Sequence, residues 1–142
     1  MIETTILSNL ILNEDYYRKV YPYLKEEYFD DNNLGKIFNT FSLYVEDYKE
    51  PPTIEALRIS IDKRKDLNED SFSVINEHMS KFEIDKDTNT QFLIDETEKF
   101  CQDKDLYNSI RKSILIMEGQ DKELDKGEIP KLLSDSLGIN FD

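Results

Sequence analysis

Residues 88–117 read TNTQFLIDETEKFCQDKDLYNSIRKSILIM and contain neither glycine nor proline. In the second half of this stretch, apolar residues recur in steps of three, four and three, which is typical of one helical face and close to a heptad seam. They are Tyr107, Ile110, Ile114 and Met117. We therefore predict one long helix of about 25 to 30 residues, with a length of about 40 Å at a rise of ~1.5 Å per residue.

A shorter helix is predicted after a polar break at residues 118–127. Residues 128–137 place further apolar side chains on one helical face, and the two helices form a predicted hairpin, residues 88–138. The two stripes offer more apolar surface than two helices can bury against each other. We therefore predict that the hairpin binds a second copy of the chain. The predicted interface residues are Tyr107, Ile110, Ile114, Met117, Ile129, Leu132 and Leu133.

The first part of the chain, residues 1–87, predicts a globular head of about five helices. Asn13, Thr53 and Asn68 each precede a helical pattern and are suited to cap it, and Pro22 must end or kink the second helix. The third helix carries an apolar stripe from Leu34 to Tyr48. No window alternates in the manner of a strand, so the predicted class is all-α: a helical head followed by a hairpin.

The amino-acid composition limits the classes of function that the chain can have. The chain has 31 acidic against 18 basic residues and a net charge of −13, which argues against a general phosphate-binding surface and predicts weak binding, at best, to single-stranded DNA. No apolar run is long enough to span a membrane. The single cysteine excludes an internal disulfide, so we expect a cytoplasmic protein.

Residues that could perform chemistry are few. We expect His78 at the surface or its boundary, and Cys101 as a half-buried small hydrophobic residue. Gly35-Lys36 lies inside a helical pattern and lacks the remaining residues of a phosphate-binding loop. The prediction is that the chain has no catalytic, cofactor-binding or metal-ligating residues.

Two alternative functions stay open. Asp85, Asp87, Asn89 and Glu96 match ligand positions of an EF-hand calcium loop, although Thr90 stands where that loop needs glycine. A free-standing acidic protein that mimics DNA, or inhibits a nucleic-acid enzyme, is the other alternative. A mimic should align its carboxylates along one face, whereas lysine and arginine are interspersed along this chain.

Several segments in sequence order carry a family resemblance. They are an Ile/Leu-rich first helix followed by Asn13, an aromatic turn, an Ile-Phe pair, a proline-led restart and two later segments. Their residues are 6–13, 28–30, 37–38, 50–57, 96–100 and 137–142. In these features the chain resembles the N-terminal domain of DnaB-type replicative DNA helicases, most closely the T-even-phage-like branch.

The resemblance implies an oligomerisation domain. Hairpins would pair between subunits, six copies would form a collar around the path of single-stranded DNA, and the collar would bind primase and a helicase loader. In the family, a linker leads to a motor that hydrolyses ATP with Mg²⁺ and moves 5′ to 3′ along DNA. We expect residues 139–142 to begin that linker. No motor lies within these 142 residues, so ATP and Mg²⁺ are not expected to bind here.

Overall fold

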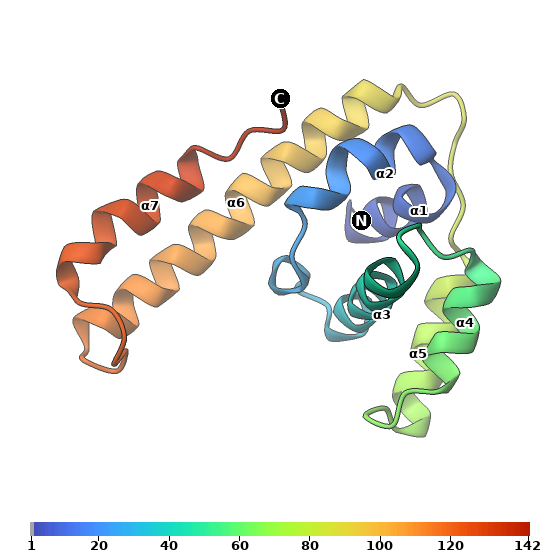
Figure 1. Ribbon diagram of the computed structural model, residues 1–142, viewed down its shortest axis with the longest axis horizontal. Coiled ribbons are helices and arrows are strands. Elements are labelled where there is room, and N and C mark those ends of the chain that lie inside the picture. The colour runs from blue at the N-terminus through green and yellow to red at the C-terminus, as the bar shows by residue number, and fades with distance from the viewer. Residues whose placement is uncertain (1) are drawn as a thin grey trace. The chain divides into compact units, whose positions relative to one another are not determined.

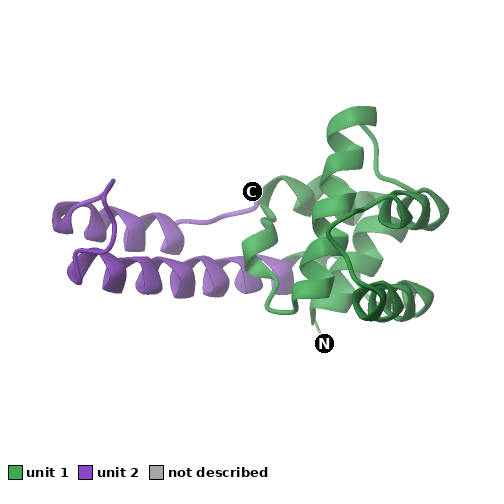
Figure 2. Cartoon of the chain, turned by 90° about the horizontal axis from the view of Figure 1, so that it is seen from below, with its two compact units in different colours: residues 1–94 green, residues 95–142 purple. Residues whose placement is uncertain are grey.

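The computed structural model describes residues 2–142, and every regular element in that range is a helix (Figure 1). The predicted all-α class is therefore confirmed. The chain divides into two compact units, residues 1–94 and 95–142 (Figure 2). We call the first unit the head and the second the hairpin unit. The long helix α6 (Thr90–Met117) starts with the last residues of the head, so the structural division falls in its second turn, whereas the sequence placed it between residues 87 and 88.

The head packs its helices around a central one. Its elements are α1 (Ile2–Leu12), α2 (Glu14–Val20), the 3-10 turns η1 (Tyr21–Tyr23) and η2 (Glu26–Tyr28), α3 (Asn32–Tyr48), α4 (Ile54–Asp62) and α5 (Glu69–Ser80). α3 contacts α1, α4 and α5. Large apolar side chains from all of these helices are fully buried, which is the arrangement of a self-contained core. They include Ile6, Tyr16, Ile37, Phe41, Leu57 and Ile75.

Side-chain caps set the helix boundaries in the head. The predicted caps Asn13, Thr53 and Asn68 each accept a hydrogen bond from a backbone N–H in the first turn of the following helix. α3 begins at Asn32, before the predicted apolar stripe, because the Asp31 carboxylate accepts from two backbone N–H groups there. α2 ends at Val20 and gives way to η1, which contains the proline that was predicted to end or kink the helix.

The hairpin unit consists of most of α6, the 3-10 turn η3 (Lys126–Glu128) and α7 (Ile129–Leu137). α7 runs beside α6 in the opposite direction (Figures 1 and 2). α6 ends because Gly119 adopts a left-handed conformation with φ of 73°, and the N–H groups of Gly119 and Gln120 bond back to the carbonyls of Ile116 and Leu115. This is the usual way in which a glycine terminates a helix.

The last residues return along α6. Gln102 Nε2 donates to the Ile139 carbonyl at 2.7 Å, and the backbone N–H of Phe141 donates to Glu98 Oε2 at 2.8 Å. The Phe141 side chain is 3% exposed. Residues 139–142, which we expected to begin a linker, are thus held against the first helix of the hairpin by side chains one helical turn apart.

Candidate functional site

The contact between α6 and α7 contains a polar centre. Ser136 on α7 is completely buried, and its hydroxyl lies 2.7 Å from the hydroxyl of Ser109 on α6. The same Ser136 hydroxyl donates to a carboxylate oxygen of Asp105. Ser113, one turn further along α6, is also buried and donates to the Ser109 carbonyl. Small hydroxyl groups and a carboxylate therefore occupy part of the surface where a stable hairpin would usually place leucine or isoleucine.

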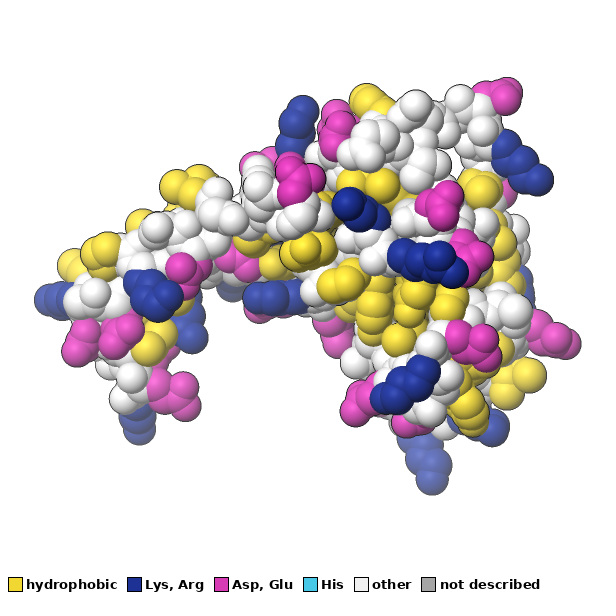
Figure 3. Space-filling model, turned by 45° about the horizontal axis from the view of Figure 1, so that its top comes forward, with side chains coloured by type: hydrophobic (Ala, Val, Ile, Leu, Met, Phe, Trp, Pro, Cys, Tyr) yellow, Lys and Arg dark blue, Asp and Glu magenta, His cyan; other side chains and the backbone are white. Residues whose placement is uncertain are grey.

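Phe100, Ile116 and Phe141 of the hairpin unit are buried, but other large apolar side chains of this unit are exposed, and Figure 3 shows separate apolar patches on it at the left of the view. Six of these side chains are between 45% and 67% exposed: Tyr107, Ile110, Ile114, Leu115, Met117 and Leu137. Scattered exposed leucines are ordinary on a soluble protein. An apolar groove lined from both helices of a short hairpin is less common, and such surfaces mark interaction sites.

Five of the seven predicted interface residues line one shallow groove of about 390 Å³, which we call the hairpin groove. They are Ile110, Ile114, Met117, Ile129 and Leu133. Ser113 and Glu118 complete its lining. Tyr107 is 57% exposed and Leu132 is half-buried, and neither lines the groove. Their participation in an interface stays a prediction, as it does for the other five.

The predicted interface leaves out two exposed apolar residues of this unit. Leu115 is 45% exposed. It directly follows Ile114, so it does not belong to the series of apolar residues spaced by three or four positions. Leu137 is 67% exposed and follows Leu133 by four residues, so its spacing did carry the signal. The exposed apolar surface is therefore wider than the predicted stripe.

Cys101 does not provide a reactive thiol. Its side chain is fully buried, and burial, followed by the nearby carboxylates of Asp105 and Glu98, raises the pKa of the thiol to about 12. Because the thiolate is the nucleophilic form, the group stays protonated and unreactive at neutral pH.

The acidic segment that resembles a calcium loop has a different conformation. In an EF-hand, the twelve ligand-loop positions wrap around the ion, whereas here α6 already begins at Thr90, the sixth position. The Asn89 side chain accepts from the Phe92 N–H and so caps α6. The Asp85 carboxylate accepts from the Asp87 N–H. Across residues 2–142 no group of three or more His, Cys, Asp or Glu side chains is placed to hold a metal ion.

The described helices were also compared with the requirements for a membrane span and for a phosphate-binding loop. None of them is both long enough and apolar enough to cross a bilayer. Gly35-Lys36 lies within α3, and the Gly35 N–H donates to the Asp31 carbonyl at 2.9 Å. A phosphate-binding loop needs free backbone N–H groups, so this pair does not form one.

Comparisons with known proteins agree with the helical architecture. The family model described as "DnaB-like helicase N terminal domain" matches residues 1–111. A curated protein of Enterobacteria phage T4, the "DnaB-like replicative helicase", is 31% identical over 145 aligned positions. The alignment covers 96% of the present chain and 30% of the phage T4 protein, so the chain spans less than a third of that relative.

Proposed function

Because the chain belongs to the family of DnaB-like helicase N-terminal domains, we propose that it joins the subunits of a hexameric, phage-type replicative DNA helicase. Hairpins of neighbouring subunits pair through the hairpin groove, and six copies form the collar of the ring. The collar recruits primase and a helicase loader. ATP hydrolysis and movement along DNA belong to a motor domain outside these 142 residues.

The observation that supports pairing is that the hairpin buries a polar side chain and exposes large apolar ones. Ser136, a polar residue, is completely buried between the two helices, whereas Ile114 and Met117 are more than half exposed. Burying an aliphatic side chain contributes ~1.5–3 kcal/mol. Several such side chains on one face therefore favour a second apolar surface against them, with coiled-coil-like packing of α6 against its counterpart.

The rest of the chain is consistent with a binding role. The backbone N–H of Gly35 is used within a helix, which leaves no phosphate-binding loop at the only Gly-Lys pair. We therefore expect no ATP turnover by this chain, with or without single-stranded DNA. The net charge of −13 favours weak DNA binding at physiological salt. The collar would surround the DNA without binding it tightly.

Sedimentation velocity with the substitution Ile114→Asp tests the pairing. The wild-type chain should sediment as a dimer or larger species at micromolar concentration. The substitution places a carboxylate in the hairpin groove of both copies. It should raise the dissociation constant by roughly a hundredfold or more, because each copy loses an aliphatic contact of ~1.5–3 kcal/mol.

Leu43→Asp is the matched control. Leu43, on α3 in the head, is 52% exposed, as Ile114 is, but it lies outside the hairpin groove. This variant should sediment like the wild type. The proposal fails if the wild type is a monomer at high concentration, if both variants dissociate equally, or if Ile114→Asp abolishes the helical circular dichroism of the whole chain.

A further inference from the structure

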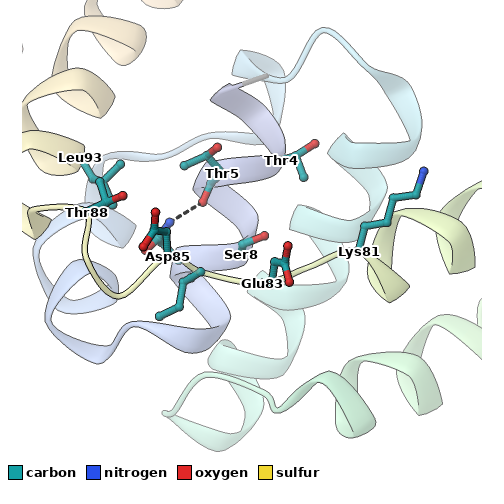
Figure 4. A pocket seen from close by; sticks show the side chains of 10 residues that line it. Thr4, Thr5, Ser8, Lys81, Glu83, Asp85, Thr88 and Leu93 are labelled. Atoms are coloured by element: carbon teal, nitrogen blue, oxygen red, sulfur yellow. Dashed lines mark hydrogen bonds between the residues drawn. The ribbon is translucent and has the colours of Figure 1, made fainter.

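The head contains a polar pocket of about 290 Å³ between the start of α1 and the loop that follows α5. Figure 4 shows the side chains that line it. Thr4, Thr5 and Ser8 contribute hydroxyl groups from α1, and Glu83 and Asp85 contribute carboxylates from the loop. The pocket lies wholly in the head, apart from the hairpin groove, and the proposed pairing of hairpins does not use it.

Ser8 borders this pocket and makes no side-chain hydrogen bond within the described residues. Its side chain is 2% exposed. The neighbouring Asn9 differs, because its amide nitrogen donates to the Thr5 carbonyl and its oxygen accepts from Asn13. Among the described residues, the buried side-chain nitrogen or oxygen atom that lacks a partner is Asn108 Nδ2, so the Ser8 hydroxyl is reached from the pocket. It can therefore bond to a polar group that enters the pocket.

The charge at the pocket selects a cation. Glu83 has no hydrogen-bond or ion-pair partner among the described residues. Asp85 uses one carboxylate oxygen to accept from the Asp87 N–H and leaves the other open. Lys81, the basic residue of the lining, is paired with Glu77 at 3.3 Å on α5. The open groups are thus two carboxylates and the hydroxyl oxygen of Ser8, all of which can accept hydrogen bonds.

We propose that this pocket receives an arginine side chain presented by a partner protein. A guanidinium group carries five N–H donors in a planar fork, which can reach two carboxylates and a hydroxyl together. The pocket also has an apolar wall, formed by Ile84 and Leu93, that suits the methylene stem of an arginine. A lysine ammonium is a compact charge that cannot span the same set of acceptors.

Backbone NMR of the full chain with a small probe tests this proposal. Titration with N-acetyl-arginine amide at ~150 mM salt, where surface charges are screened, should produce saturable shifts at residues 4–9 and 83–88. N-acetyl-citrulline amide, which has nearly the same shape without the charge, should produce none. Glu83→Gln should weaken the binding by about tenfold, the effect of losing one charged acceptor.

The matched control is Glu46→Gln, which removes an exposed carboxylate from α3 and should leave the titration unchanged. The Ser8→Ala variant should also weaken binding while it keeps the helical circular dichroism of the wild type. Equal shifts with citrulline, the absence of saturable shifts, or shifts of these residues by inorganic phosphate would each overturn the proposal. The phosphate result would assign an anion site to Lys81 instead.

Discussion

In the head, Tyr16, Ile37 and Phe41 are at most 1% exposed, whereas in the hairpin unit Tyr107, Ile114 and Met117 are at least 52% exposed. The two units are built from the same kind of amphipathic helix, so the difference lies in what each apolar face meets. In the head, the main apolar faces meet other helices of the same unit, although single side chains such as Leu43 stay exposed. In the hairpin unit, Ile114 and Met117 border the open hairpin groove, and polar side chains occupy part of the contact between the two helices.

Both units bury some polar side chains, in different places. In the head, Arg64 donates to the oxygens of Asn39 and the buried Thr40 at 2.8 Å and pairs with the exposed Asp66. In the hairpin unit, the buried Ser136 bonds to Asp105 between the two helices. A buried polar centre contributes less stability than apolar packing. The head should therefore be stable alone, and the hairpin unit should gain most of its stability from a partner.

The substitution with the largest expected effect is Phe41→Ala. Phe41 is completely buried in the core of the head, and removing a buried phenylalanine side chain lowers the free energy of unfolding by ~3–5 kcal/mol. Urea denaturation followed by circular dichroism measures the loss. Leu137→Ala in the hairpin unit, at a site that is 67% exposed, should cost less than ~0.5 kcal/mol in the monomer. Equal losses would show that the contrast between the units is wrong.

An intermediate effect is expected from Ser136→Ala. The change removes a hydroxyl that bonds to Ser109 and Asp105 between the two helices. Losing a buried hydrogen-bonding partner costs ~1–3 kcal/mol, so amide hydrogen exchange in α7 should accelerate roughly 5- to 150-fold while exchange in α4 stays unchanged.

Ser134→Ala is the control for this measurement, because Ser134 is an exposed serine on the same helix. It should change the exchange of α7 little. If Ser136→Ala also left the exchange of α7 unaltered, the polar centre would not hold the hairpin together.

The smallest expected effect is the pH dependence of the stability that Asp66 contributes to the head. Hydrogen bonds from Arg64, then from Lys36, hold the pKa of the Asp66 carboxyl well below its usual range. A folded-state pKa that is depressed contributes stability above the unfolded-state pKa of ~3.9, and this contribution is lost as the pH falls below that value. The stability difference between wild type and Asp66→Asn should therefore be constant from pH 7 to about 5 and shrink below about pH 4. A difference that persists in acid would contradict the assignment.

Much of the fold could be predicted because its causes are local. Capping by Asn13, Thr53 and Asn68 depends on one side chain and the next few backbone N–H groups. α3 starts two residues before its apolar stripe, because the cap at Asp31 lies outside that stripe. The end of α6 at Gly119 likewise follows from a single residue that tolerates positive φ.

The candidate sites were less accessible to sequence reasoning. The pocket beside Ser8 combines residues from α1 and from a loop more than 70 positions later. Local sequence patterns do not predict that two such distant segments lie side by side. Arg64 reaches Asn39 and Thr40 for the same kind of reason. The five groove-lining residues of the hairpin were predicted because their spacing defines a face. Whether that face binds another copy is a property of two chains.

The sequence by itself determined that this protein is a series of amphipathic helices with defined ends, because periodicity and caps act within a few residues. It also determined that one apolar stripe, from Tyr107 to Met117, exceeds what a two-helix hairpin can bury. Only the tertiary structure decided which face of α6 lies against α7. The spacing of residues fixes which side chains share a helical face, but the direction of that face depends on the packing of the whole unit. That packing turned Ser109 towards Ser136 and left Ile114 exposed to solvent.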